Sequence, residues 1–221
     1  MLPRMTPIAS TGASTTSRIA CSSLKASVLK SGATALLSIA ALLLSATSAQ
    51  AVTYYWDEDQ ATAGFGSAAG TWENPTVDKW SLDAAGTAAA GPSITTADGD
   101  LLYFGTDTVA LGTGTISITG TVAAKELLFG KASGSNTLGA VDTDAIISLG
   151  ASPKIYAAST DGSTISTHTI NTNLTSSSTL TIGRQSTANE SYIINGDISG
   201  TFALQMKVLN NSAYIALDGD N

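Results

Sequence analysis

The chain has 221 residues, one cysteine and a formal net charge of −7, with 17 acidic residues against 10 basic ones. An acidic surface repels nucleic acid and anionic lipid, so neither is an expected partner. The cysteine, Cys21, lies near the amino terminus, so the remaining chain can form no internal disulfide and must be stabilised by burial and backbone hydrogen bonds.

Residues 1–51 have the three parts of an export signal. A basic segment without acidic residues comes first, an apolar run follows at 33–45, and Ala49-Gln50-Ala51 is a small-x-small cleavage sequence. As a helix the run would span about 20 Å, less than the roughly 30 Å of a bilayer core, which argues against a membrane anchor. We therefore predict cleavage between Ala51 and Val52 and an exported protein, extracellular or associated with the outer membrane at the cell surface.

Residues 52–99 are predicted to form an irregular cap that contains all three tryptophans. Trp56, Trp72 and Trp80 lie in a segment otherwise dominated by Gly, Ala, Thr and Asp. Large aromatic side chains contribute most to packing where other apolar side chains are few. The favoured interpretation is therefore a small packed layer, and the alternative is a glycan-stacking platform formed by Trp72 and Trp80.

Residues 100–221 contain short strand-like runs separated by turn residues. In the Ile-Ser-Ile-Thr run at 116–119 and the Leu-Thr-Ile run at 180–182, apolar residues fall on one face and hydroxyls on the other. Aliphatic residues of one size class suit stacking in a narrow core. We predict an all-β fold, a right-handed parallel β-helix or solenoid, with a β-sandwich as the alternative. At roughly 20 to 25 residues per coil, the segment would make about five or six coils.

Short motifs occur along the same chain in a recognisable order. They are Trp56-Asp57, Gly70-Thr71-Trp72, Lys79-Trp80, Leu102-Tyr103-Phe104-Gly105, the Val-Ala-Ala-Lys-Glu-Leu-Leu-Phe run at 122–129, and the alternating runs at 194–200, 204–207 and 215–221. On these motifs the chain resembles the bacterial exported proteins that carry autotransporter-associated β-strand repeats, also called passenger-associated transport repeats. The resemblance implies the amino-terminal part of a β-helical passenger, with 100–221 a truncated repeat region whose downstream repeats or translocator are missing.

Residue types that carry catalysis or bind metals are sparse. His168 is the only histidine, and its place in the strand-like run 166–170 predicts an ordinary outward-facing polar residue. The acid pairs at 98/100, 142/144 and 218/220 have the spacing of turns and match no calcium-binding loop. We therefore predict no catalytic residue, no metal site and no cofactor.

These observations lead to two hypotheses on function. The first is an exported structural or adhesin-like β-helical protein, not an enzyme, whose partners are surface glycans or other cell-surface proteins. The second is a secreted carbohydrate-binding or polysaccharide-active β-helix protein, suggested by the tryptophans and the acidic turns.

Overall fold

The computed structural model describes residues 50–60, 62–130, 135–157, 165–184, 189–207 and 213–220. The chain divides into two units, Met1–Thr47 and Ser48–Asn221, and every described residue belongs to the second. All but the last two residues of the predicted signal peptide therefore lie outside the described part. Among the described residues, no helix has the length and apolar character needed to cross a membrane.

The described chain is built from β-strands. Their bounds are β1 (Thr53–Trp56), β2 (Thr71–Trp72), β3 (Trp80–Ser81), β4 (Leu101–Phe104), β5 (Gly114–Ile118), β6 (Thr121–Phe129), β7 (Asn136–Ala140), β8 (Ile146–Ala157), β9 (Ile165–Ile170), β10 (Asn173–Ser176), β11 (Leu180–Arg184), β12 (Asn189–Ile194), β13 (Ile198–Gly200), β14 (Leu204–Lys207) and β15 (Ile215–Leu217).

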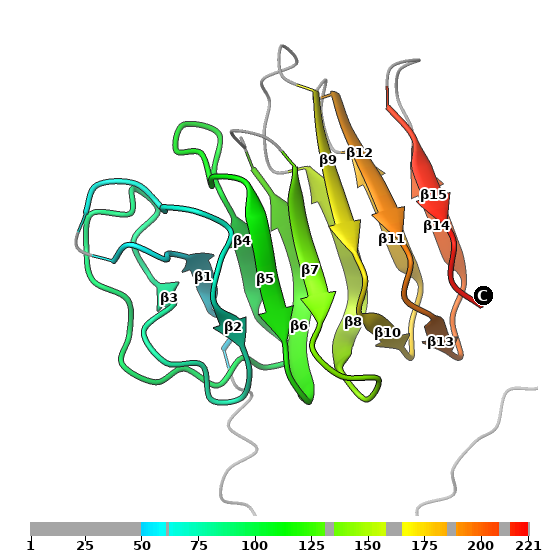
Figure 1. Ribbon diagram of the computed structural model, residues 1–221. Helices are drawn as coiled ribbons and strands as arrows, with labels where there is room; N and C mark the ends of the chain where they lie inside the picture. The colour runs from blue at the N-terminus through cyan, green and yellow to red at the C-terminus, as the bar shows by residue number, and fades with distance from the viewer. Residues whose placement is uncertain are drawn as a thin grey trace, which may run out of the picture. The chain divides into compact units, whose positions relative to one another are not determined.

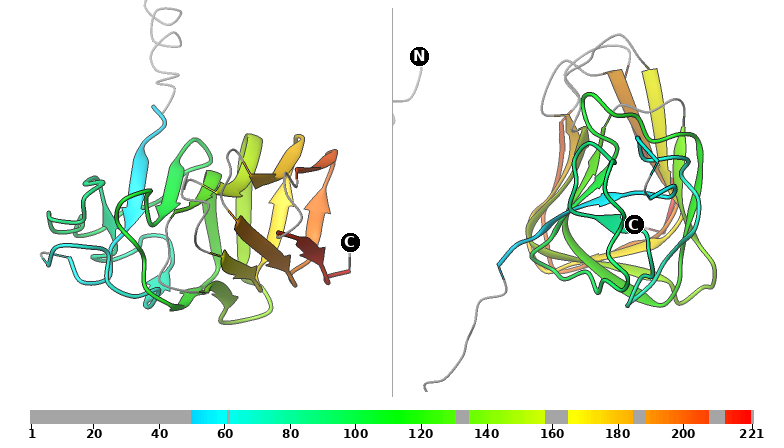
Figure 2. Two further views of the ribbon diagram at one scale, coloured as in Figure 1. Left: turned by 90° about the horizontal axis from the view of Figure 1, so that it is seen from above. Right: turned by 90° about the vertical axis from the view of Figure 1, so that its left-hand side faces the viewer.

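These strands form two sheets that are extended coil by coil (Figure 1). The nine-stranded sheet has the order β13-β10-β8-β6-β4-β1-β3, and β11 and β14 continue it beside β8. The six-stranded sheet has the order β15-β12-β9-β7-β5-β2. Because the chain alternates between the sheets, each strand except β3 pairs in parallel with the strand one coil away, and Figure 2 shows the coils superimposed around a common interior when viewed along the stack.

The predicted all-β parallel solenoid is confirmed, whereas the sandwich alternative is not, because the strand pairs from β4 onward are parallel. The expected number of five or six coils was too high, since the solenoid has about four turns. Most coils are close to the expected length, for example 127 minus 102, or 25, residues from Leu102 to Leu127 and 204 minus 180, or 24, from Leu180 to Leu204, whereas the coil from Asn136 to His168 takes 168 minus 136, or 32, residues.

The interior is made of columns of side chains that repeat at the same register. Leu102, Leu127, Ile155 and Ile182 form one such column, and each is fully buried. The outward neighbours Thr181 and Ser117 lie between buried residues, as the period of two requires. The predicted alternation in the runs 116–119 and 180–182 is therefore confirmed.

The cap region is more regular than its sequence suggests. β1 pairs in parallel with β4, and β2 pairs in parallel with β5, so the cap extends both sheets. β3 then runs antiparallel to β1, with Trp56 opposite Trp80. Because β3 is antiparallel, it ends the parallel stacking at this side of the sheet. The Trp80 side chain of β3 is nevertheless buried within the cap.

Candidate functional site

The three tryptophans form one buried cluster in the cap. Trp56 and Trp72 are fully buried, and Trp80 is 1% exposed. The Trp80 ring lies edge-on to both, at centroid distances of 4.9 Å from Trp56 and 5.5 Å from Trp72. Neither Trp72 nor Trp80 presents a ring face to solvent, so the glycan-stacking platform predicted from these two residues is wrong and the packing interpretation holds.

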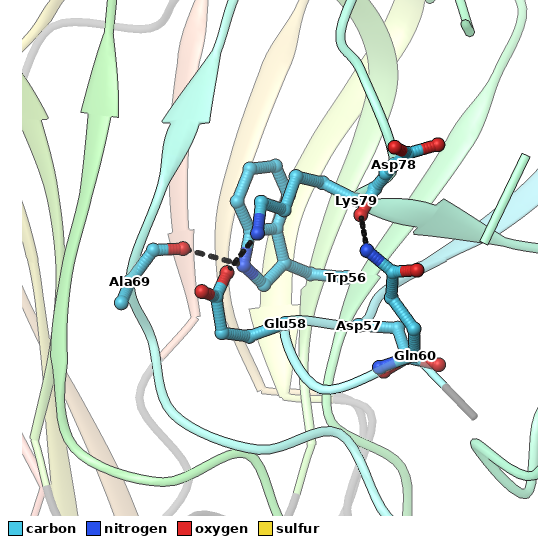
Figure 3. A network of polar contacts seen from close by, with 7 residues as sticks. All are labelled: Trp56, Asp57, Glu58, Gln60, Ala69, Asp78 and Lys79. Carbon is cyan, nitrogen blue, oxygen red and sulfur yellow. Dashed lines mark hydrogen bonds and ion pairs between the residues drawn. The ribbon is translucent and has the colours of Figure 1, made fainter. Parts of the chain in front are cut away.

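Polar contacts tie the cap strands together around this cluster (Figure 3). The indole N–H of Trp56 donates to the Ala69 carbonyl at 3.1 Å, and Lys79 Nζ lies 2.6 Å from Glu58 Oε2. The Gln60 side-chain amide donates to the Asp78 carbonyl at 3.1 Å. Each contact joins a residue at or just after β1 to the segment around β2 or β3, so this network serves the cap's own cohesion.

Asp57 is the buried carboxyl of this network. It is fully buried, and its Oδ1 accepts the backbone N–H of Gln60 at 2.9 Å. Burial disfavours the charged form and raises the pKa of Asp57 to about 6, and the neighbouring Asp59 acts in the same direction. The cap thus contains a carboxyl group that is protonated at mildly acidic pH, where an ordinary aspartate is charged.

His168 faces the interior, so the predicted outward orientation was wrong. The side chain is fully buried and stacks on Phe129 at a centroid distance of 4.4 Å. Its Nε2 lies 3.8 Å from Glu190 Oε2, but burial lowers the pKa of His168 to about 3, so the imidazole is neutral at neutral pH and the contact is no ion pair. The run Ser-Thr-His-Thr-Ile at 166–170 has polar residues in both phases, so its pattern could not reveal which face is buried.

The acidic turns hold backbone groups in place. Asp100 accepts the N–H of Val52 at 3.0 Å through Oδ1 and that of Ala97 at 2.8 Å through Oδ2. Asp142 Oδ1 accepts the N–H of Asp144 at 3.2 Å. Over the described ranges, no three His, Cys, Asp or Glu side chains converge as metal ligands would.

A polar ladder at one corner of the solenoid was missed by the sequence analysis. The Asn195 amide donates to Asn171 Oδ1 at 2.8 Å, and the Asp197 N–H donates to Asn173 Oδ1 at 3.0 Å, in each case 24 residues apart. The Asp220 N–H donates to Asp197 Oδ1 at 2.8 Å, 23 residues apart. The recurrence of Asn or Asp at that interval was the signal that could have revealed it.

The outer face of the nine-stranded sheet carries a row of three tyrosines and one leucine, here called the tyrosine row: Tyr55, Tyr103, Leu128 and Tyr156. Consecutive members are register partners on β1, β4, β6 and β8. Their sequence neighbours Leu102, Leu127 and Ile155 point into the core, so the row points outward. The three tyrosines are half-buried, and the rings of Tyr55 and Tyr103 lie 5.1 Å apart.

A charged pair lies beside the tyrosine row. Glu126 is 6% exposed, and its carboxylate accepts hydrogen bonds from Lys154 Nζ at 3.2 Å and from the Tyr156 hydroxyl at 3.0 Å. The Lys154 ammonium also lies 5.6 Å from the centre of the Tyr156 ring. Burial and then the Glu126 carboxylate raise the pKa of Tyr156, so its hydroxyl remains a proton donor.

A bulge in β8 explains how these groups come together: Ala124 pairs with Leu149 and Glu126 with Lys154, so the extra residues lie in β8. The register between β6 and β8 shifts between Ala124 and Glu126. Beyond the shift Glu126 pairs with Lys154 and Leu128 with Tyr156, and these four side chains share the outward face. The sequence shows these residue types but not the bulge, so the tyrosine row could not be found from spacing alone.

The fold and its surfaces define a parallel β-solenoid protein closed at one end by a tryptophan-containing cap. No protein-family model, no curated protein and no solved structure matches the chain.

Proposed function

We propose that this protein is an exported structural, adhesin-like β-solenoid of the cell surface or the secreted fraction, without a catalytic role. The observation that carries the proposal is the unbroken parallel ladder from β4 through β6 and β8 to β10 and β11, and on to β13 and β14. A stack of coils of this kind presents an extended surface, and its mechanical role follows from its construction.

Two features make such a stack rigid. Backbone hydrogen bonds join each coil to the next along both sheets, and aliphatic columns such as Leu127, Ile155 and Ile182 fill the space between the sheets. Outward positions carry hydroxyl and amide groups, as at Thr137, Thr169 and Asn173, which suits a surface in contact with water or with another polar surface. Weak contacts repeated from coil to coil would add up to useful avidity.

The proposal also extends the resemblance to proteins with autotransporter-associated repeats. Its support is the export-signal pattern of residues 1–51 and the order of the motifs described above. The motifs between residues 56 and 129 occupy β1, β2, β3, β4 and β6 in the cap and the first coils, and the alternating runs contain β13, β14 and β15. The proposed partners are surface glycans or other cell-surface proteins, and the outward surface is the part of the molecule that would meet them.

The tryptophans no longer support the alternative of a carbohydrate-binding or polysaccharide-active protein, because Trp72 and Trp80 are buried. A surface that could bind carbohydrate without catalysis exists elsewhere, on the tyrosine row, and is treated below.

The test is to fractionate cells that produce the protein and to determine the amino terminus of the native species. We expect a mature chain that begins at Val52, and we expect protease added to intact cells to degrade it or the medium to contain it. Retention inside the cell of a chain that still carries residues 1–51 would refute the proposal.

A pair of variants makes this test specific. Ala51→Arg places a large charged side chain at the cleavage position and should block processing, so that the uncleaved chain accumulates. The matched control Thr137→Ala changes an outward position on β7 and should leave processing and surface exposure unchanged.

A further inference from the structure

We propose that the tyrosine row, together with Glu126 and Lys154, is a binding site for a linear neutral glycan. The inference rests on the proposed function, because it names the kind of partner that the outward surface would bind. It is independent of the tryptophans, whose rings are buried in the cap.

The positions of the three tyrosines favour a ligand that lies along the row. Tyr55, Tyr103 and Tyr156 lie on one face of one sheet, at register positions fixed by parallel pairing. Neighbouring strands are about 4.8 Å apart, so Tyr103 and Tyr156, two strands from each other, are separated by about 9.6 Å along the row. A glycan lying along the solenoid axis would meet Tyr55, Tyr103 and, beyond the buried Leu128, Tyr156, and the C–H face of a sugar ring packs against an aromatic ring.

Neighbouring side chains hold the tyrosine rings in place. Leu128 lies between Tyr103 and Tyr156 in the row and is 1% exposed, so the row has a continuous apolar floor. Tyr55 is flanked by Tyr103 and by Phe65, whose ring is parallel to its own to within 4° at 6.0 Å. Rings held by neighbours on both sides lose little conformational entropy when a ligand binds.

Polar groups of Glu126, Lys154 and Tyr156 lie at the edge of the tyrosine row. Glu126 is nearly buried yet satisfied by Lys154 and Tyr156, which fixes the positions of a carboxylate, an ammonium and a phenol beside the rings. The Lys154 side chain is 45% exposed, so its ammonium can also donate to a ligand hydroxyl. A few placed polar groups at the edge of an apolar surface are the usual arrangement of a site that recognises a polyhydroxylated ligand.

Charge selects among glycans. The chain has a formal net charge of −7, so the protein as a whole would repel a polyuronate, while within the site the Lys154 ammonium balances the Glu126 carboxylate. The row ends at Gly183, the register partner of Tyr156, where a Cβ would lie 2.2 Å from the Lys207 carbonyl oxygen and the backbone has a φ of +147°. No side chain can therefore extend the row past β8, and the site is limited to β1, β4, β6 and β8.

The experiment is isothermal titration of the protein with cellohexaose and with chitohexaose, and with hexagalacturonate as the anionic comparison. We expect binding of at least one neutral hexasaccharide and none of the polyuronate. Tyr103→Ala and Tyr156→Ala should each weaken binding by about tenfold or more, which corresponds to about 1.4 kcal/mol. Absence of binding to both neutral probes would overturn the proposal while leaving the export and the solenoid architecture unaffected.

Two further variants guard against effects on folding. Tyr214→Ala removes a half-exposed tyrosine that lies off the row, just before β15, and should leave affinity unchanged. Lys154→Met removes one donor to the nearly buried Glu126 and leaves the Tyr156 hydroxyl in place, so it should weaken binding about threefold and lower the thermal midpoint by a few degrees, which is measured beside the affinity. An equal loss of affinity in Tyr214→Ala and Tyr103→Ala would show that the row is not the site.

Discussion

The cap and the coil that contains β13, β14 and β15 bury similar side chains to very different extents. In the cap, Trp56, Trp72 and Trp80 are at most 1% exposed. In that coil, Met206 occupies the same inward column as Leu127 and Ile182 but is 57% exposed. In a solenoid, a side chain that points inward is therefore not buried by its direction alone. Burial requires material on both sides along the axis.

The cap supplies that material by changing the direction of the chain. Antiparallel β3 lies against β1, and the contacts between Glu58 and Lys79 and between Trp56 and Ala69 hold the loops over the tryptophans. In the coil of β13 to β15, Leu204, Ile215 and Leu217 are only half-buried within the described part of the chain. We therefore expect the two regions to respond differently to the same kind of change.

The largest expected effect is in the tryptophan cluster. Trp80→Ala should lower the free energy of unfolding by about 3–5 kcal/mol, because it removes the ring that contacts both other tryptophans and leaves a cavity. The matched change Met206→Ala should cost less than about 0.5 kcal/mol, because that side chain is mostly solvated. Urea denaturation followed by circular dichroism measures both, and equal losses would contradict the comparison.

A second pair tests the aliphatic columns. Leu127→Ala should destabilise the protein by about 2–5 kcal/mol, because Leu127 is fully buried between Leu102 and Ile155. Leu204→Ala should cost about 1 kcal/mol, since that side chain is only half-buried. The same denaturation measurement applies, and a larger loss from Leu204→Ala would show that the coil of β14 is packed more tightly than the structure indicates.

The third prediction concerns pH and the middle of the solenoid. Burial lowers the folded-state pKa of His168 to about 3, so the unfolded chain binds a proton that the folded chain excludes below about pH 6.5. Stability should therefore fall by about 2 kcal/mol between pH 6.5 and pH 5 through this group alone. Glu190, Tyr192 and Phe129 surround the imidazole, and the Glu190 carboxylate is the one charge within 4 Å of it in the described structure.

The neutral variant His168→Gln isolates this contribution. Its free energy of unfolding should be less dependent on pH than that of the parent between pH 6.5 and pH 5. Parallel curves for the two proteins over this interval would mean that folding does not shift the pKa of His168.

The smallest expected effect has the opposite sign and belongs to the cap. Burial raises the pKa of Asp57 to about 6, so its contribution to stability is fully present below about pH 4 and is lost as pH rises through 6. Asp57→Asn keeps an acceptor for the Gln60 N–H and removes the charge. Relative to the parent, the variant should gain about 1 kcal/mol between pH 5 and pH 7. A constant difference between the two proteins in thermal unfolding over this range would contradict the shift.

Much of this architecture could be predicted from the sequence. Alternation in runs such as 116–119 and 180–182 predicted strands with one buried face, because the pleat itself has a period of two, and the aliphatic, Thr-, Ser-, Asn- and Gly-rich composition favoured parallel stacking over a sandwich. The tryptophan-containing cap was also predicted, since a segment poor in other apolar residues must bury its aromatic rings together. Among the candidate residues, the acidic turns were correctly interpreted as structural at Asp100 and Asp142.

Three features were decided only by the tertiary structure. His168 faces inward because of the phase of β9, which the run Ser-Thr-His-Thr-Ile leaves ambiguous. The tyrosine row exists because the coils between its members differ in length and β8 contains a bulge opposite β6, so residues at unequal sequence spacing reach one register. Trp72 and Trp80 are in the core because antiparallel β3 pairs with β1 and places the Trp80 ring against Trp56 and Trp72. Local sequence determines which residues alternate, whereas coil length and bulges, set by packing across the whole stack, decide which of them meet.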